Sequence, residues 1–572
     1  MNVLSAVRGY VDKIVGDPNC PGMKVLLLDE CTTKTVAMVY SQTEILDKEV
    51  FLVERLEQAC KHEVMKHLKA CVFVRPTAGN LEVLKQELRR PRFSEYHIFF
   101  SNVVAGDALK GLAEADDGEV VRQVQEYYAD YVPVNEALFS INQRQSLRLS
   151  TELRDAFHQD MFARNVTGLL SCLLSLKIQP SCIRYAGASR VAKAVAAECA
   201  KQIADDGIFH FAQRGAGAGP LLLVLDRADD AVTPLLSQWT YQAMVHELLG
   251  LNSNRVKLKG APGVKDKDLE EVVLSASVDA FYAANMFANF GDLGMAVKDL
   301  LDDYQRQTKM NENIKSIEDM QSFMERYPAF RSKSLNVSKH VALISELSRL
   351  VDVYRLMDVS QLEQDVACND DKSTQWREVL QRLNDSAVKA PDKLRLAMLY
   401  ALRYESAQAS TTDRLKLGLE ENRVAPDKVA LVDAVLKYGG KRARGPGLFD
   451  SNKSLLAKFS KQVKSSLEGV DNVYAQHVPL LMETLDAVAK GKLNSQHYPS
   501  VGASSAPLQN AKHPQVVVFV VGGVTYEEAT KVAELNAANA GLSVVLGGSF
   551  VHNSGTFLED LDDAFGRGAA GR

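Results

Sequence analysis

Cysteine is scarce in this chain, with eight residues in a length of 572. No two cysteines form a C-x-x-C pair, and no group of cysteines and histidines has the spacing of a zinc finger. These absences argue against a disulfide framework and against a structural zinc site. We therefore expect reduced, buried thiols in a cytosolic protein, and no bound metal.

Long apolar runs and blocks of basic charge are also missing. No stretch reaches the roughly 18 to 20 apolar residues that span a bilayer, and the first residues lack the apolar core and cleavage site of a signal peptide. The formal net charge is −5, from 67 basic and 72 acidic residues. Nucleic-acid binding needs a concentrated positive field, so we do not expect it. Any contact with membranes is expected to be indirect.

The motifs of common enzymes are absent as well. There is neither a G-x-x-x-x-G-K-[ST] phosphate loop nor a G-x-S-x-G nucleophile elbow. Gly522-Gly523 and Gly547-Gly548 follow apolar strands but lack the G-x-G-x-x-G spacing of a dinucleotide site. His62 and His67 stand five residues apart, which places them on different faces of a helix. The sequence therefore predicts no cofactor.

Short apolar runs alternate with charged segments in the first 135 residues. Lys24–Leu28, Cys71–Val74 and His97–Phe100 are typical of buried parallel strands. The segments Asn80–Arg90 and Asp107–Tyr128 between and after them have helical periodicity. This order predicts a parallel sheet covered by helices.

A long helical stretch separates this region from a second α/β segment. Helical periodicity dominates from Tyr241 to Tyr438, and strands return at Val516–Val521 and Leu542–Leu546. We predict an α/β plus α fold with two parallel-sheet α/β domains. The second of these is discontinuous, because a mainly helical third domain is inserted into it.

The segment Asp226-Arg-Ala-Asp-Asp230, after a buried strand, is the most suggestive one for chemistry. Carboxylates at strand ends often bind metals or act as acid–base groups. Asp and Arg in this position can equally cap the next helix and pair with each other. The residues alone leave both interpretations open.

The thirty residues from Leu221 to Gly250 read LLLVLDRADDAVTPLLSQWTYQAMVHELLG. This run closely resembles the signature of the Sec/Munc-type (SM) family of syntaxin-binding proteins. Further stretches resemble the family in the family's own order: EYHIFFSNV, SQLEQDVA, DKLRLAMLYALRYE, NVYAQHVPLL and VVVFVVGGVTYEEA. YQAMVHELLG, VYAQH and LGGSFVHNS resemble its endosomal and trans-Golgi branch, the vacuolar protein sorting forty-five type.

The resemblance implies an arch of three domains. The first spans residues 1–136, the second 137–242 together with 450–572, and the third 243–449, which carries a helical hairpin. Asp226, Arg227 and Asp230 then become a structural junction between the second and third domains, and catalysis is no longer expected.

Two binding regions follow from the same resemblance, both in the first domain. Asp29, Lys34 and Glu54 are expected to line the cleft that holds the syntaxin, with solvated loop charges as the alternative. An apolar pocket is expected to capture the N-terminal peptide of the syntaxin, with ordinary core packing as its alternative. Its expected residues are Leu112, Val120, Val121, Val124 and Val132.

A third contact is expected at the helical hairpin, which templates a vesicle SNARE in the family. Proline stops a helix, so Pro328, between the helical runs Ser316–Glu325 and Val337–Tyr354, is the expected hinge. The implied function is to bind a syntaxin-type Qa-SNARE and the other SNAREs of an assembling bundle, and so to promote docking and fusion in endosomal, trans-Golgi and vacuolar traffic. A tethering factor is a further expected partner.

The expected location is the cytoplasm, with peripheral association to endosomal and Golgi membranes through the syntaxin. One alternative is an SM protein of another trafficking branch. The other is an α/β hydrolase or nucleotide-dependent enzyme that uses Asp226 or Gly522.

Overall fold

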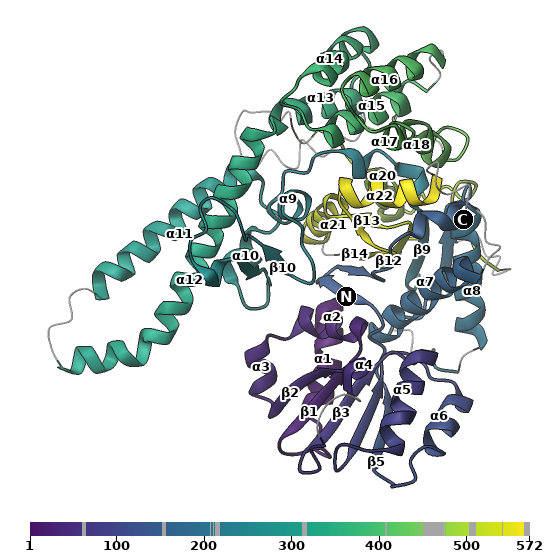
Figure 1. Ribbon diagram of the computed structural model, residues 1–572. Helices are drawn as coiled ribbons and strands as arrows, with labels where there is room; N and C mark the ends of the chain where they lie inside the picture. The colour runs from purple at the N-terminus through teal and green to yellow at the C-terminus, as the bar shows by residue number, and fades with distance from the viewer. Residues whose placement is uncertain are drawn as a thin grey trace.

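The computed structural model describes residues 1–59, 64–151, 156–205, 207–209, 211, 218–311, 317–405, 409–445, 447–449, 474, 476–502, 511–539 and 541–565. Two α/β lobes and a helical lobe form an arch, and a long helical arm projects from its side (Figure 1). The N-terminus lies where the two α/β lobes meet. This architecture is the predicted fold class.

The first sheet has five parallel strands in the order β2-β1-β3-β4-β5. Its strands are β1 (Lys24–Leu28), β2 (Val50–Arg55), β3 (Lys69–Val74), β4 (Tyr96–Phe100) and β5 (Val121–Glu126). The helices of this lobe are α1 (Val3–Val15), α2 (Glu30–Val39), α3 (Gln42–Leu46), α4 (Leu56–Ala59), α5 (Ala78–Arg89) and α6 (Gly106–Ala113).

Both faces of this sheet are covered, which explains its continuous apolar runs. Leu26 and Leu28 of β1 pack with α1 and α2, whereas Val25 and Leu27 pack with α5 and α6. A strand that is buried on both sides has no polar alternation. The two edge strands, β2 and β5, lie at opposite ends of the sheet.

The second sheet has six strands in the order β6-β7-β14-β12-β9-β8, parallel except for the β6–β7 pair. Its strands are β6 (Val132–Asn135), β7 (Leu138–Ser140), β8 (Cys182–Tyr185), β9 (Leu221–Asp226), β12 (Gln515–Val521) and β14 (Ser543–Gly548). Its lobe also contains α7 (Ala156–Ser175), α8 (Arg190–Asp205), α20 (Leu480–Ala489), α21 (Tyr526–Ala538), α22 (Ser554–Phe565), β13 (Val524–Thr525), β15 (Val551–His552), and the 3-10 helices η1 (Ser146–Ser150), η2 (Arg227–Asp230) and η3 (Thr233–Leu235).

The two α/β lobes share one apolar core. Val3 and Val7 of α1 belong to the same buried cluster as Leu222 of β9 and Val517 of β12. The backbone N–H of Val3 also donates to the carbonyl of Glu136, 2.9 Å away. Helix α1 therefore packs in the core of both sheets and connects the two lobes rigidly.

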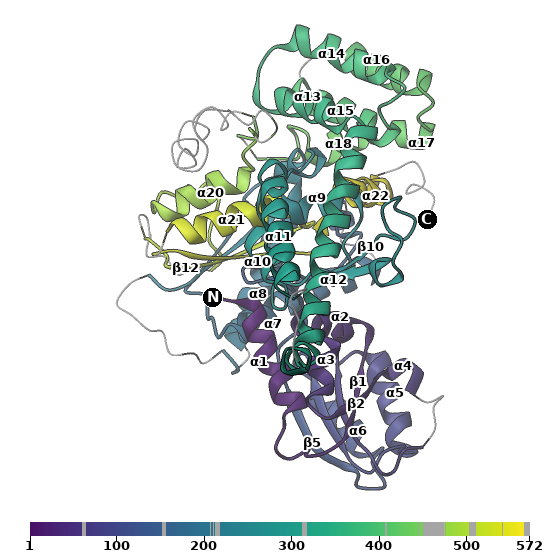
Figure 2. The same ribbon diagram turned by 90° about the vertical axis from the view of Figure 1, so that its left-hand side faces the viewer.

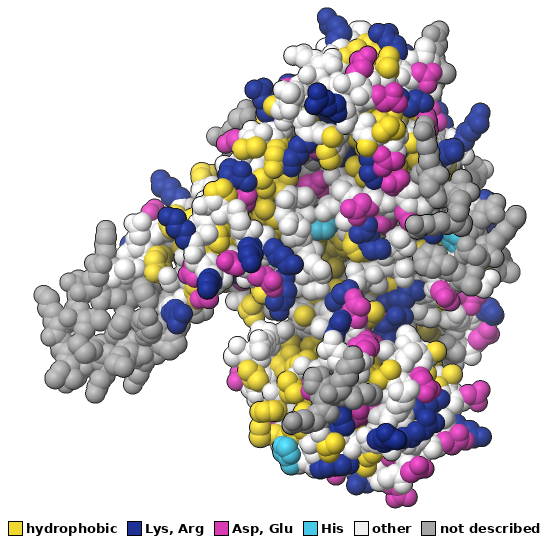
Figure 3. Space-filling view, viewed as in Figure 1, with side chains coloured by type: hydrophobic (Ala, Val, Ile, Leu, Met, Phe, Trp, Pro, Cys, Tyr) yellow, Lys and Arg dark blue, Asp and Glu magenta, His cyan; other side chains and the backbone are white. Residues whose placement is uncertain are grey.

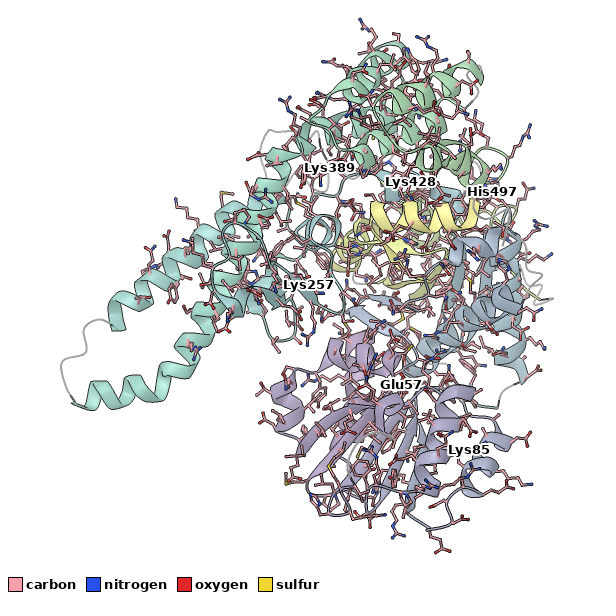
Figure 4. The ribbon with its side chains drawn as sticks, viewed as in Figure 1. Glu57, Lys85, Lys257, Lys389, Lys428 and His497 are labelled. Carbon is pink, nitrogen blue, oxygen red and sulfur yellow. The ribbon has the colours of Figure 1, made fainter. Side chains whose placement is uncertain are left out.

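The inserted region between β9 and β12 is mainly helical (Figure 2). Its elements are α9 (Tyr241–Leu248), β10 (Arg255–Lys257), η4 (Lys267–Leu269), β11 (Glu271–Val273), α10 (Ala280–Asn285), α11 (Phe290–Asn311), α12 (Ile317–Val353), α13 (Leu356–Cys368), α14 (Lys372–Asn384), α15 (Ala390–Arg403), α16 (Ala409–Glu421), α17 (Pro426–Val429) and α18 (Leu431–Gly439). Helix α22 of the second lobe packs into the core of the α13–α18 bundle. Lys428 of α17 pairs with Asp562 of α22 at 2.7 Å (Figure 4).

The projecting arm consists of α11 and α12 (Figure 1). The hydroxyl of Tyr304 on α11 donates to Ser334 on α12 at 3.0 Å, which joins the two helices. The predicted helical runs on either side of Pro328 belong to one continuous helix, so Pro328 does not separate two helices. A proline removes one backbone donor and can be carried inside a helix. The side chain of Pro328 lies outside the described residues.

Two further boundaries differ from the sequence-based expectation. The segment Asp107–Tyr128 is not a single helix, because its second half is strand β5, which pairs with β4. Strand β6 belongs to the second sheet and pairs with β7, so the expected domain boundary at residue 136 falls inside a hairpin. Among the described residues, none of the helices is both long and apolar enough to cross a membrane.

Candidate functional site

Asp29 is buried at the end of β1, where it caps helix α2. One carboxylate oxygen accepts a hydrogen bond from the backbone N–H of Thr32 at 2.7 Å. The other accepts from the Arg75 N–H and from the Asn80 side chain, each at 2.7 Å. Its carboxylate therefore holds β1, β3 and α5 together and has no exposed charge to offer a partner.

Glu54 and Lys34 lie on different sides of the first sheet. Glu54 is aligned with Leu27, which faces α5, and its side chain is 8% exposed and 3.4 Å from Arg92. Lys34 is on α2, which covers the opposite face, and it pairs with the exposed Glu30 at 3.1 Å. The structure thus does not bring the three expected cleft residues together on one surface.

A surface that sequence reasoning missed lies along the edge strand β2. Phe51 is 56% exposed, Val53 is 43% exposed, and Leu46 on the neighbouring α3 is 53% exposed. Val53 and Arg55 are aligned with Leu26 and Leu28, so they lie on the α2 side of the sheet. We call this surface the β2 face, and it consists of Glu30, Lys34, Leu46, Phe51, Val53 and Arg55.

The β2 face combines apolar area with charges of both signs. Large exposed aromatic and aliphatic side chains that cluster on a surface mark an interaction site. Arg55 and Lys34 both lower the pKa of Glu30, with the hydrogen bond from Lys34 as the larger cause. In the space-filling view, apolar side chains gather on the edge of the lower lobe, and the molecule is hollowed between this lobe and the arm (Figure 3).

The arm is fastened at its base by a buried polar cluster. Asp279 pairs with Lys339 and with the ring of His340, 2.9 Å away, and His340 also contacts the hydroxyl of Tyr241 at 2.8 Å. Burial opposes ionisation of Asp279, but the hydrogen bonds from His340 and Lys339 outweigh it and hold its pKa below the usual range. Met295 of α11, by contrast, is 62% exposed. The arm therefore has a fixed base and an accessible surface.

The five residues expected in the peptide pocket do not form one site. Leu112 is buried on α6, and the half-buried Val120 and Val121 pack against the same core. Val124 on β5 is 42% exposed. Val132 lies on β6 and packs against the other core, which the two lobes share. Of these five residues, the exposed one is therefore Val124, on the α6 side of β5.

A buried ionic network joins the two α/β lobes. Asp130 lies 2.7 Å from Arg75 at the end of β3 and 3.1 Å from Arg164 of α7. Its carboxylate also accepts a hydrogen bond from Asn102 at 3.1 Å. No local sequence motif predicts this network, because its residues come from segments far apart in the sequence. Their charges reach each other only after both lobes have folded.

Asp226, Arg227 and Asp230 meet in a second buried network. Asp226 accepts hydrogen bonds from Ser189 at 2.6 Å and from the N–H of Ala228 at 2.9 Å. Arg227 donates to both oxygens of Glu528 at 2.8 Å and lies 3.5 Å from Asp230.

This second network connects three parts of the chain. Asp230 accepts hydrogen bonds from Thr233 at 2.6 Å and from the N–H of Leu480 at 3.2 Å. Burial raises the pKa of Asp226, and no metal-binding group of three or more His, Cys, Asp or Glu residues exists in the described part of the chain. The arrangement is that of a packed junction, with every carboxylate engaged inside the protein.

Comparison with known proteins places this chain in a family. A model described as the Sec1 family matches residues 24–560. Vacuolar protein sorting-associated protein 45 of Rattus norvegicus is 48% identical over 98% of this chain and 96% of that protein. The Saccharomyces cerevisiae protein of the same name is 35% identical, over 99% and 100%.

Solved structures give the same result. The SM protein Vps45 in complex with the Qa SNARE Tlg2 is 40% identical, with a TM-score of 0.90 and coverage of 99% of this chain and 98% of that one. The Unc18–syntaxin 1 complex of Monosiga brevicollis, at 20% identity and a TM-score of 0.80, shares the fold.

The chain belongs to the Sec1 family, which contains the SM proteins. Within it, the relatives named vacuolar protein sorting-associated protein 45 are 35 to 48% identical to it. Rat Sec1 family domain-containing protein 1 is 25% identical over 96% of the chain. The predicted family and branch are thereby confirmed.

Proposed function

We propose that the chain is an SM protein that binds a syntaxin-type Qa-SNARE and the assembling SNARE bundle, and so promotes vesicle docking and membrane fusion in endosomal, trans-Golgi and vacuolar traffic. This proposal is supported by the solved complex of Vps45 with the Qa SNARE Tlg2. That Vps45 is 40% identical to this chain, and the match covers 99% of the chain.

The β2 face carries the proposal. A helical SNARE presents apolar and charged side chains in alternation around its axis, and interfaces of this kind rest on a few exposed aromatic or aliphatic anchors. Phe51 and Val53 supply the anchors, and Lys34, Arg55 and Glu30 supply charges for orientation. The exposed side of the arm forms the second wall.

Further contacts belong to the same proposal. The N-terminal peptide of the syntaxin binds beside α6 and β5, near Val124 and the buried Leu112. The arm templates a vesicle SNARE, with Pro328 as its hinge. Functionally the chain divides into three domains. The first spans residues 1–136, the second 137–242 together with 450–572, and the third 243–449. The Asp226–Asp230 junction couples the second domain to the third.

The protein acts by binding and not as an enzyme. It favours correct SNARE bundles over competing arrangements, and it needs no cofactor for this. A tethering factor contributes to its recruitment, and the syntaxin holds it at endosomal and Golgi membranes from the cytoplasm. The engagement of Asp226 and Asp230 by protein donors supports a structural role for these carboxylates.

A calorimetric titration of the full chain with the cytosolic part of a trans-Golgi or endosomal syntaxin tests the proposal. The syntaxin is used with and without its N-terminal peptide. We expect binding to both forms, with weaker binding after the peptide is removed. Equal affinity for the two forms would show that the peptide site does not contribute to binding, and it would leave the β2 face as the docking surface. Absence of binding to either form would refute the proposed function.

A further inference from the structure

Two thiols face each other inside the first lobe. Cys20 lies in the connection between α1 and β1, and Cys71 lies on the central strand β3. Their sulfur atoms are 3.6 Å apart, and the Cys71 thiol donates to Cys20. Among the seven cysteines that the structure describes, these two are in sulfur–sulfur contact.

A histidine completes the cluster. His97 on β4 is aligned with Cys71 across the β3–β4 pair and also lies against Cys20. The hydrogen bond from Cys71, followed by that with His97, lowers the pKa of Cys20 against the opposing effect of burial. Other charged groups near the cluster are Lys24, Asp17 and Glu95, whose carboxylate lies 4.0 Å from the His97 ring. A thiolate beside an imidazolium is the reactive form of cysteine.

An open groove leads from the surface to this cluster. It has a volume of about 810 Å³ and is lined by Asn19 and Pro21, the two neighbours of Cys20, and by His97. Both sulfurs are themselves buried. His97 borders both the groove and the cluster, and the Cys20 segment between the groove and the sulfurs has neither helix nor strand geometry, so a small displacement of it would admit an oxidant.

We propose that Cys20 and Cys71 are a reversible oxidation site, at which hydrogen peroxide or a related hydroperoxide converts the two thiols into a disulfide. The Cys20 thiolate attacks one peroxide oxygen, the O–O bond breaks, and the departing hydroxide takes a proton from His97 and leaves as water. The sulfenic acid on Cys20 is then attacked by Cys71. The S–O bond breaks, the S–S bond forms, and the second oxygen leaves as water with the Cys71 proton.

The overall reaction is balanced. Two thiols lose two electrons and two protons, and one peroxide becomes two water molecules. The sulfurs must approach from 3.6 Å to the bond length of about 2.05 Å. The new bond ties the α1–β1 connection to the centre of the first sheet, and a dithiol reductant reverses it.

Peptide mapping of the full chain tests the proposal. The protein is treated with hydrogen peroxide at neutral pH, free thiols are blocked with N-ethylmaleimide, and the digest is analysed by mass spectrometry. We expect a linked pair of peptides containing Cys20 and Cys71, which dithiothreitol separates. Unlinked peptides, or Cys20 oxidised to the sulfinic acid without a link to Cys71, would overturn the proposal.

Variants separate the roles of the residues. The link should disappear in Cys20→Ser and persist in Cys172→Ser, a matched change of another buried cysteine. His97→Gln should still form it, but about a hundredfold more slowly, because glutamine cannot give a proton to the departing hydroxide. An unchanged rate in His97→Gln would remove the histidine from the mechanism. If Cys20→Ser does not fold, the wild-type peptide map decides the outcome.

Discussion

Two strand ends of this molecule look alike in sequence and differ in structure. Each parallel strand, β1 and β9, ends in an aspartate that accepts a hydrogen bond from a backbone N–H of the next turn. Beyond Asp29, the charged pair Glu30 and Lys34 has side chains that are 62% and 30% exposed. Beyond Asp226, the side chains of Arg227 and Asp230 are each 3% exposed.

The difference teaches that position at a strand end does not decide whether a charge is functional. Helix α21, which carries Glu528, and the helical insertion cover the end of β9, so its charges must pair inside the protein. The region after β1 borders the hollow beside the arm (Figure 3). Charges there remain available to a partner. Four predictions sharpen this contrast.

Replacement of Arg227 by alanine should have the largest effect. It leaves the buried Glu528 and Asp230 without their cation, and loss of one member of a buried ion pair costs about 3–5 kcal/mol. Chemical denaturation measures this as a lower midpoint. Arg349→Ala, in an exposed pair with Glu346, should leave the midpoint unchanged. Equal midpoints for Arg227→Ala and the wild type would contradict the structural role.

Acidification should lower stability through two buried neutral histidines, His552 in the second lobe and His246 in the helical insertion. Burial lowers the pKa of His552 to about 3 and that of His246 to about 4. Below pH about 6.5 the unfolded chain binds protons that the folded state excludes, so stability is present above that pH and falls as the pH drops. At pH 5 the cost is about 2 kcal/mol for each histidine.

Thermal denaturation across pH 7 to 5 checks this prediction. His552→Gln keeps a donor for the carbonyl of Gly522 and should flatten the pH dependence. The exposed His497 provides the control, because His497→Gln should leave the slope as it is (Figure 4). A wild-type midpoint independent of pH in this range would show that these side chains are not buried as neutral groups.

Phe51→Arg should weaken syntaxin binding without loss of stability. It replaces an exposed apolar anchor of the β2 face, and such changes cost on the order of 1–2 kcal/mol, or about fivefold to thirtyfold in affinity. Leu417→Arg, at a similarly exposed leucine on α16, is the matched control and should bind normally. If both variants bind like the wild type, the β2 face is not the docking surface.

Lys34→Glu should have the smallest effect. The Lys34 side chain is 30% exposed and its partner Glu30 is 62% exposed, so the pair is solvated and stability should change by less than about 0.5 kcal/mol. Charges at the rim of an interface mainly change the association rate. Stopped-flow binding should show a slower association that becomes normal at high salt. A large change in the dissociation rate would instead place Lys34 at the centre of the interface.

The sequence was sufficient for the fold class and the family. Runs such as Lys24–Leu28 are strands because both faces of the sheet are covered. The spacing of Val121 and Val124 is typical of a helix, and only the pairing with β4 makes this segment a strand. Pairing partners in a sheet are distant in the chain, so local periodicity cannot reveal them.

The candidate site was less predictable for the same reason. Asp29 is buried because Arg75 and Asn80 cover it and donate hydrogen bonds to its carboxylate. Glu54 is buried because Arg92 pairs with it. Nothing next to Asp29 or Glu54 in the chain announces these partners. Phe51, in contrast, stands in an apolar strand and is nevertheless exposed, because β2 is an edge strand.

The most direct test is a competition experiment with purified syntaxins. The full chain is titrated with cytosolic fragments of an endosomal or trans-Golgi syntaxin and of an exocytic syntaxin under identical salt conditions. We predict at least tenfold tighter binding of the endosomal or trans-Golgi fragment, which corresponds to about 1.4 kcal/mol. Tighter binding of the exocytic fragment, or no binding of either, would contradict the proposed function.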